Sequence, residues 1–124
     1  MSGFASLAMI NLDAADPAGL AKFYSQVLGW EVTHSEADYA MIGDGSVSLG
    51  FGRVPGYSAP GWPDEAGPKR YHLDFYVDDL DKAEELALAL GATKPAEQPN
   101  PDRWRVLLDP AGHPFDICPR PAAS

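Results

Sequence analysis

Residues 16–30, DPAGLAKFYSQVLGW, carry most of the information about the fold. They begin with Asp16 and Pro17, because an aspartate can accept hydrogen bonds from the free amides of a first helical turn and proline fits the first helical position. Gly29, near the end, is a typical helix terminator. Between these signals, apolar side chains recur at helical spacing. The stretch therefore predicts a helix with one apolar face, made of Leu20, Phe23, Tyr24, Val27 and Leu28.

Segments of extended character lie on both sides of this helix. Residues 4–12 predict a strand before it, and residues 30–34 predict one after it. Residues 39–42 and 46–51 flank Asp44-Gly45, which is a strong signal for a two-residue hairpin loop. Residues 4–53 therefore predict a first module with the order strand, helix, strand, strand, strand.

The second half of the chain repeats this order. Residues 71–77, YHLDFYV, predict a strand, and Asp81 and Glu84 have the spacing of a capping box at a helix start. Gly29 and Gly91 are separated by the same number of residues as Asp16 and Asp78, so the two halves can be superposed. The second helix is expected to bury Ala83, Leu86, Ala87 and Leu90, and the later strands are predicted at residues 93–96, 104–108 and 114–118.

The repeat predicts one α+β domain over residues 1–124, made of two modules of strand, helix and three strands. A connector rich in glycine and proline, about 54–70, joins the first module to the second, about 71–119, and residues 120–124 form a loose tail. The connector carries Tyr57 and Trp62, aromatic residues that are costly to leave in water. They either close over a ligand or only pin the connector to the domain.

Composition and charge exclude several classes of function. A net charge of −9 with few, scattered basic residues disfavours nucleic acid and anionic membranes as partners. There is no long apolar run for a membrane span, and the N-terminus lacks the pattern of a signal peptide. The single cysteine, Cys118, cannot form an internal disulfide, so we expect a reducing, cytoplasmic location.

The strand at residues 71–77 carries an informative alternation. Leu73, Phe75 and Val77 share one face and are expected to pack beneath a helix, whereas His72, Asp74 and Tyr76 share the other. Three polar side chains in a row on the inner face of a sheet need water, a ligand or a hydrogen-bond network among themselves. This pattern makes the three residues candidate site residues.

Four motifs resemble the vicinal oxygen chelate superfamily, which includes glyoxalase I, extradiol dioxygenases and the bleomycin- and fosfomycin-resistance proteins. They are DPAGLAKFYSQVLGW (16–30), HLDFYVDDLDKA (72–83), LGA (90–92) and LLDPAGHPFDI (107–117), and the match is nearest to the small glyoxalase-like domain group. The resemblance implies two βαβββ modules whose strands form a curved, partly open mixed sheet around a small-molecule site. It also implies a homodimer, because many members are homodimers.

The resemblance further implies where a metal would be held. Metal enzymes of this superfamily place one ligand on each of four strands, and the matching positions here are Met9, Leu49, His72 and Asp116. The thioether of Met9 and the hydrocarbon side chain of Leu49 are not ligands for a hard divalent cation. We therefore expect no cofactor and no tightly held metal at the inherited site.

The remaining residues predict a site with two kinds of wall. Met9, Leu49 and Phe51 are expected to form an apolar wall with Leu7 and Val47 as neighbours. Apolar walls with a few converging polar groups are typical of small-molecule sites, and an acidic site favours a neutral or cationic ligand. The polar wall is predicted at His72, Asp74, Tyr76 and Asp116, with aromatic contributions from Tyr57, Trp62 and Trp104.

Three functions fit this pattern. The first is a metal-free protein that binds and sequesters a small organic molecule. The second is a metal-free enzyme in which His72 transfers protons and Asp74 orients it. The third is a metal-dependent lyase or dioxygenase whose missing ligands come from a partner chain or the substrate.

Overall fold

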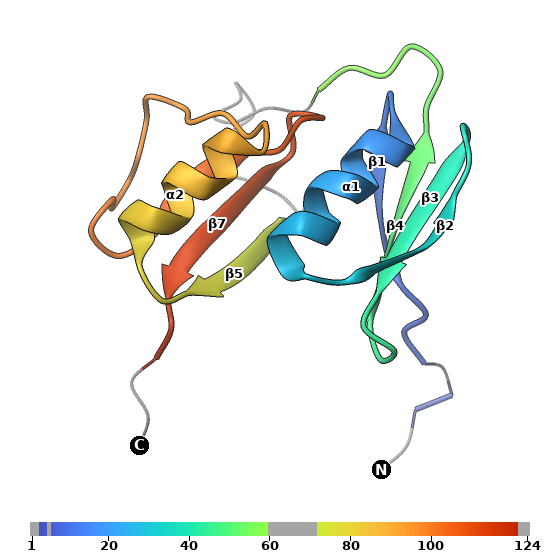
Figure 1. Ribbon diagram of the computed structural model, residues 1–124, viewed down its shortest axis with the longest axis horizontal. Helices are drawn as coiled ribbons and strands as arrows, with labels where there is room; N and C mark the ends of the chain where they lie inside the picture. Colours follow the sequence, from blue (N-terminus) through green and yellow to red (C-terminus); the bar gives the residue numbers. More distant parts are fainter. Residues whose placement is uncertain (1–2, 5, 60–71, 122–124) are drawn as a thin grey trace. The chain divides into compact units, whose positions relative to one another are not determined.

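The structure of the protein is a computed structural model that describes residues 3–4, 6–59 and 72–121 (Figure 1). Trp62 and most of the predicted connector lie outside the described residues. The chain divides into two compact units at the boundary between Tyr57 and Ser58. Within the described residues, each unit holds one helix and one small mixed sheet that is open rather than closed into a barrel, so the fold class is α+β.

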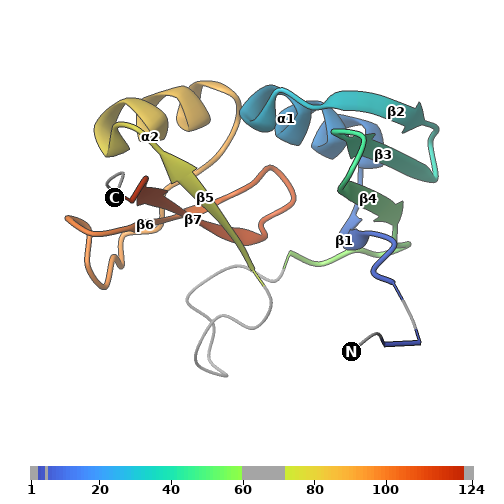
Figure 2. The same ribbon diagram turned by 90° about the horizontal axis from the view of Figure 1, so that it is seen from below.

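The first unit has the predicted order of elements. Its four-stranded sheet has the strand order β1-β4-β3-β2, in which β1 runs parallel to β4 and the other neighbours are antiparallel. Figure 2 shows the helix on one side of this sheet. The elements are β1 (Ile10–Ala14), α1 (Pro17–Leu28), β2 (Glu31–Ser35), β3 (Tyr39–Gly43) and β4 (Ser48–Arg53).

The second unit has the same strand order as the first, except that the strand equivalent to β2 is shortened to a single bridge. Its sheet has the order β5-β7-β6, with β5 parallel to β7 and β6 antiparallel to β7. The strand predicted at residues 93–96 is present only as an isolated bridge between Thr93 and Leu108. The elements are β5 (Leu73–Val77), α2 (Leu80–Ala89), β6 (Arg105–Leu108) and β7 (Pro114–Pro119).

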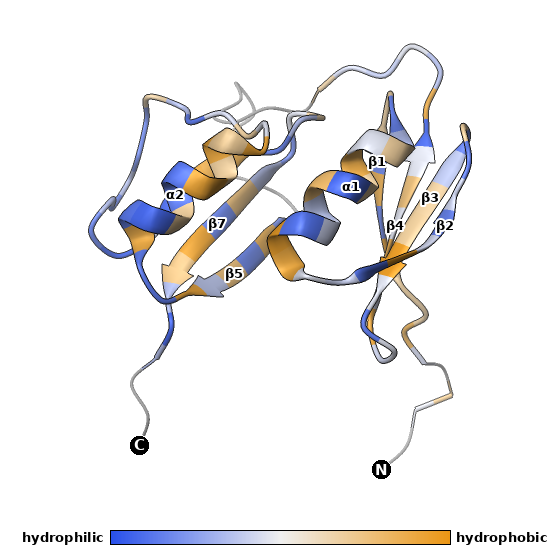
Figure 3. Ribbon diagram, viewed as in Figure 1, coloured by the Kyte–Doolittle hydropathy of each residue, from blue (hydrophilic) through white to orange (hydrophobic). Residues whose placement is uncertain are grey.

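The helix α1 begins and ends where the sequence predicts. The side chain of Asp16 accepts a hydrogen bond from the amide of Gly19 at 3.1 Å, and Pro17 takes the first helical position. Gly29 adopts φ 73°, a left-handed conformation that glycine tolerates without strain. In Figure 3 both helices alternate between hydrophilic and hydrophobic segments, as expected for helices with one face on a sheet.

The core of the first unit lies between α1 and the sheet. Leu20, Phe23 and Tyr24 of α1 are buried, and the ring of Tyr24 stacks on Phe51 of β4 with centroids 5.7 Å apart. Ile42 of β3 is also fully buried. These contacts fix which face of the sheet is turned toward the helix.

Two predicted boundaries in the first unit are corrected. The first strand was predicted from residue 4, but it begins at Ile10 because its partner β4 begins only at Ser48. The hairpin loop was predicted as Asp44-Gly45, whereas Gly43 pairs with Ser48, which makes the loop four residues long. The carboxylate of Asp44 accepts hydrogen bonds from the amides of Val47 and Ser46, and these bonds lower its pKa.

The start and the buried face of α2 also differ from the prediction. The helix is capped by Asp79, whose side chain accepts from the amide of Lys82 at 3.1 Å, so Asp81 lies in the first turn and is not the cap. Three aspartates lie close together here, and the spacing alone chose the wrong one. Ala87 is buried as predicted, but Leu86 is 56% exposed.

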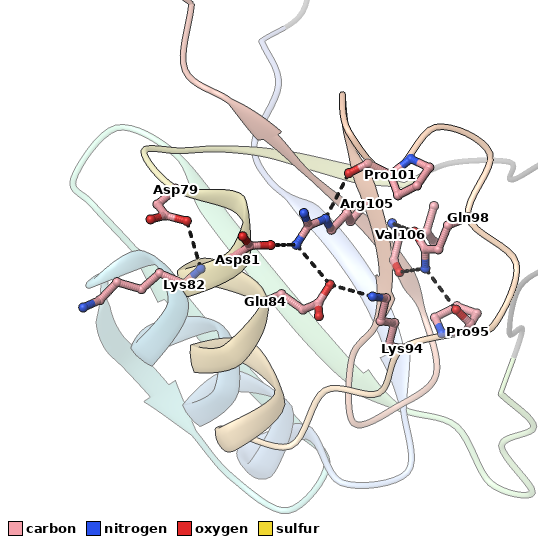
Figure 4. A network of polar contacts seen from close by, with 10 residues as sticks. All are labelled: Asp79, Asp81, Lys82, Glu84, Lys94, Pro95, Gln98, Pro101, Arg105 and Val106. Carbon is pink, nitrogen blue, oxygen red and sulfur yellow. Dashed lines mark hydrogen bonds and ion pairs between the residues drawn. The ribbon is translucent and has the colours of Figure 1, made fainter.

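A polar network joins α2 to the residues around β6 (Figure 4). Arg105 of β6 lies 2.8 Å from the carboxylate of Asp81 and 3.4 Å from that of Glu84, and Lys94 lies 3.0 Å from Glu84. The hydrogen bond to Asp81 raises the pKa of Arg105 above its ordinary value, and burial acts in the opposite direction. Ion pairs therefore join α2 to β6 where the first unit uses aromatic packing.

The structure also bears on the question of membrane insertion. Among the described residues, no helix is both long and apolar enough to cross a lipid bilayer.

The network predicts unequal costs for two substitutions. Replacing Arg105 with Met should lower the free energy of unfolding by about 1–2 kcal/mol, because Glu84, only 18% exposed, loses a hydrogen-bonding cation. The control Asp81→Asn should cost less than about 1 kcal/mol, because the Asp81 side chain is 89% exposed. Urea unfolding of the two variants measures both. Equal losses of unfolding free energy in the two variants would contradict the claim that the contact between Arg105 and Glu84 is the stabilising one.

Candidate functional site

The parallel pairing of β5 with β7 brings the predicted polar residues of the second unit together. Asp74 is the register partner of Asp116, so their side chains leave the same face of the sheet side by side. The ring Nε2 of His72 lies 3.3 Å from Oδ1 of Asp74 and 3.4 Å from Oδ2 of Asp116. The donor atoms of all three residues lie within 4.8 Å of one another. We call these three residues the His–Asp–Asp cluster.

The opposite face of the same strands holds the apolar side chains. Phe75 of β5 and Phe115 of β7 have ring centroids 5.6 Å apart, and Phe115 and Ile117 are buried. Because side chains alternate along a strand, packing these rings inside turns Asp74 and Asp116 to the open face, away from the aromatic core. Tyr76 lies on the open face as well and is 62% exposed.

Exposure differs within the His–Asp–Asp cluster. The side chain of Asp116 is 10% exposed and that of His72 is 25% exposed, whereas that of Asp74 is 62% exposed. Two carboxylates at this spacing repel each other, and an imidazole between them compensates at most one of the two charges. The cluster therefore keeps a negative charge and favours a cation or a hydrogen-bond donor as its neighbour.

The apolar wall predicted in the first unit is wrong for two of its residues. Leu49 is 3% exposed, and Phe51 is fully buried and stacked on Tyr24 of α1. Both lie on the face of β4 that packs against the helix, not on the open face. The alternation in β4 placed Leu49 and Phe51 together correctly, but it carries no information on which face the helix covers.

The open face of the first unit is instead formed around Gly50. The hydroxyl of Tyr39 lies 3.0 Å from Sδ of Met9, 3.4 Å from Oδ1 of Asn11 and 3.9 Å from Sδ of Met41. A Cβ on Gly50 would collide with Asn11 and with the Tyr39 hydroxyl, so only glycine leaves room for them. Of this group, only Met9 is among the site residues predicted from the sequence.

The internal repeat of the two units could have identified the residues around Gly50 from the sequence. Asn11 pairs with Gly50 in the first unit as Asp74 pairs with Asp116 in the second, and Met9 precedes Asn11 as His72 precedes Asp74. The position equivalent to Asp116 is therefore Gly50 rather than Leu49. A comparison of the two halves by strand register, rather than by motif, would have identified it.

The other predicted site residues occupy varied positions. Tyr57 is half-buried, and its amide donates to the carbonyl of Val54 at 3.1 Å. Trp104 is half-buried just before β6. Leu7 is 81% exposed before β1, and Val47 is 43% exposed in the hairpin loop.

The inherited four-strand metal site does not fit the residues present. The Met9 sulfur is a weak acceptor that contacts the Tyr39 hydroxyl, and Leu49 belongs to the core beneath α1. Gly50, the register equivalent of Asp116, has no side chain. None of the three offers the oxygen or nitrogen donor that a hard divalent cation needs. One imidazole and two carboxylates remain, all from the second unit, so a metal ion would depend on the His–Asp–Asp cluster within this chain.

Comparison with known proteins identifies the family. Residues 9–118 match the model of the glyoxalase-like domain. The chain therefore belongs to the glyoxalase-like domain family of the vicinal oxygen chelate superfamily.

Particular relatives are similar over most of this chain. It is 34% identical over 99 residues to "Putative glyoxylase CFP32" of Mycobacterium tuberculosis, which covers 77% of this chain but 36% of that protein. The same figures hold for the protein of that name from Mycobacterium bovis, so the chain spans about a third of the length of these curated relatives.

Solved structures share the fold. A glyoxalase/bleomycin resistance protein/dioxygenase family enzyme from Burkholderia phytofirmans is 27% identical with a TM-score of 0.65, covering 91% of this chain and 97% of that one. The bleomycin resistance determinant encoded on transposon Tn5 is 19% identical with a TM-score of 0.57, covering 95% and 100%. The second likeness shows the fold alone.

The corrected faces of the first unit predict unequal costs of truncation. Phe51→Ala should lower the free energy of unfolding by about 3–5 kcal/mol, because it removes the ring stacked on Tyr24 inside the core. Met9→Ala, on the half-buried open face, should cost about 1 kcal/mol or less. Chemical denaturation of both variants measures the difference. A costlier Met9→Ala would mean that α1 covers the other face.

Proposed function

We propose that this protein binds a small organic molecule at the His–Asp–Asp cluster without the help of a metal ion. The observation that carries the proposal is the position of His72 Nε2, within 3.4 Å of carboxylate oxygens of both Asp74 and Asp116. The cluster lies on the sheet face opposite the aromatic core, and polar groups that converge in this way are typical of small-molecule sites.

The charge of the cluster defines the class of ligand. Asp74 is the more exposed of the two carboxylates, with 62% of its side chain exposed, so it is the side chain that a ligand reaches first. Tyr76, exposed on the same face, offers an aromatic ring beside it. The ligand we propose is a small molecule with an ammonium or other hydrogen-bond donor attached to an apolar or aromatic body.

The names of relatives do not decide between binding and catalysis. One structural neighbour is a resistance determinant, another is named an oxidase, and the curated relative is named a glyoxylase. One fold therefore carries different activities, and the site itself has to supply the argument. In this site, the imidazole between the two carboxylates accounts for the cluster without a cation, which supports metal-free binding.

The ligand class is tested with benzylamine and benzoate, which share a ring and differ in charge. Benzylamine at about ten times its dissociation constant should stabilise the protein by about 1.4 kcal/mol, a rise of a few degrees in Tm, and benzoate should not. Differential scanning fluorimetry measures both. Asp116→Asn should abolish the shift, because it removes a cluster charge while keeping the side-chain shape.

The matched control is Asp102→Asn, which removes an exposed aspartate in the turn before β6. It should keep the benzylamine shift. Equal responses to benzylamine and benzoate, or an unchanged shift in Asp116→Asn, would contradict the proposed ligand class. Elemental analysis of protein purified without chelators should find less than one metal ion per chain, and a full equivalent lost in Asp116→Asn would contradict the metal-free proposal.

A second function is favoured by the same contact. A carboxylate on one ring nitrogen orients an imidazole and leaves the other nitrogen to exchange a proton with a bound molecule. We therefore propose metal-free acid–base catalysis through His72 as the alternative, with Asp74 and Asp116 as orienting groups.

Mass spectrometry of bound ligands separates the two functions. A ligand recovered unchanged after hours with wild-type protein supports binding alone. A ligand consumed by the wild type but not by His72→Gln, with unchanged Tm, supports catalysis. A ligand consumed equally by both proteins would remove His72 from the reaction.

A further inference from the structure

The outer edge of β6 is closed by a side chain where a strand would be expected. Among the described strands β6 pairs with β7 alone, so the outward N–H and C=O groups of Val106 have no neighbouring strand there. In Figure 4 the side-chain amide of Gln98 takes that place. Its Nε2 donates to the Val106 carbonyl at 2.9 Å, and its Oε1 accepts from the Val106 amide at 2.9 Å. One amide group thus reproduces the closely spaced pair of bonds of an antiparallel ladder.

Pro95 explains why a side chain is needed at this point. Thr93 and Leu108 exchange both of their backbone hydrogen bonds, at 2.9 and 2.8 Å, so the next such pair along the ladder would join Pro95 to Val106. Proline has no N–H to donate to the Val106 carbonyl. The Nε2 of Gln98 also donates to the Pro95 carbonyl, at 3.0 Å, and it therefore supplies the donor that the proline lacks.

The rest of the β6 edge is covered as well. The amide of Trp104 donates to the carbonyl of Asn100 at 3.0 Å, and Leu108 is bridged to Thr93. We call residues 93–100 the strap. Most residues of the strap are exposed to solvent, so without the strap the outer edge of β6 would be exposed too.

The sequence around β6 is suited to pairing with itself. In an antiparallel pair of two β6 strands centred on Val106, Arg105 of one copy lies opposite Leu107 of the other, and Trp104 lies opposite Leu108. No charged side chain then faces a like charge, and the pairs other than Arg105 with Leu107 are apolar. Uncovered strand edges are templates for pairing between copies, and a two-fold pair of this kind is closed and symmetric.

We infer that the strap, with Gln98 at its centre, keeps the β6 edge from pairing with a second copy of this chain. Gln98 makes the two hydrogen bonds with Val106 that an incoming β6 strand would otherwise make. The inference lies within the second unit and does not rest on the function proposed for the His–Asp–Asp cluster.

Gln98→Met tests the inference, because methionine keeps the length of the side chain and removes both the donor and the acceptor. In sedimentation velocity over a hundredfold range of protein concentration, the mass of Gln98→Met should rise above that of the wild type. In dilute Gln98→Met the Val106 amide should exchange its hydrogen about tenfold faster than in the wild type, and its protection should return as the mass rises. The matched control Gln26→Met, at an exposed position of α1, should follow the wild type.

A rescue variant tests the role of Pro95. Pro95→Ala restores a backbone N–H at the ladder position, so Pro95→Ala combined with Gln98→Met should regain the wild-type mass and slow exchange at Val106. Gln98→Glu, which keeps the acceptor and removes the donor, carries the same comparison if Gln98→Met does not fold.

Two results would overturn the inference. One is a mass that follows the wild type at every concentration in the Gln98 variants. The other is association in which the Val106 amide stays unprotected, because the copies would then meet through a different surface. Association that Pro95→Ala does not reverse would overturn the role of Gln98 as the substitute for the missing donor.

Discussion

The pairing of Asp74 with Asp116 across two parallel strands is the constraint on which the candidate site depends. Register partners in a parallel ladder project their side chains from the same face, so two carboxylates are held side by side. Such a pair is unfavourable unless a proton, a cation or a hydrogen-bond donor lies between them. His72 fills that place from the position just before β5, the strand that carries Asp74. The sheet, more than any loop among the described residues, thus assembles the site.

Much of the fold follows from the sequence because local signals and the repeat agree. Asp16, Pro17 and Gly29 define α1, and they do so through backbone hydrogen bonds that depend only on neighbouring residues. The signals were weaker where several residues could play one role. Asp79 and Asp81 can each cap a helix, and only the geometry of the preceding backbone selects Asp79.

The site was predictable in one unit and not in the other, for a physical reason. In β5 the two faces differ in polarity, so the alternation identified His72, Asp74 and Tyr76 directly. In β4 the second face carries Ser48 and the two glycines Gly50 and Gly52, so it holds no row of polar side chains that would mark it as open. Only the packing of Phe51 against Tyr24 reveals that Leu49 faces the helix. The face of β4 that is buried is therefore set by a contact with α1, and the sequence of β4 alone does not indicate it.

The two units have diverged in how they hold their helices and in what their open faces offer. The first packs aromatic rings beneath α1 and presents a hydroxyl between sulfurs, whereas the second ties α2 to β6 through Arg105 and presents carboxylates. The two units share a similar strand order, and the different side chains on their open faces give them different chemistries.

The protonation of His72 Nε2 tests the central claim most directly, because a nitrogen that donates to a carboxylate cannot also bind a metal ion. Long-range ¹H–¹⁵N correlation spectra of the imidazole ring, recorded at neutral pH before and after addition of zinc, report its state. We predict a protonated Nε2 that zinc leaves unchanged. A bare Nε2 whose resonance moves on addition of one equivalent of zinc would contradict it.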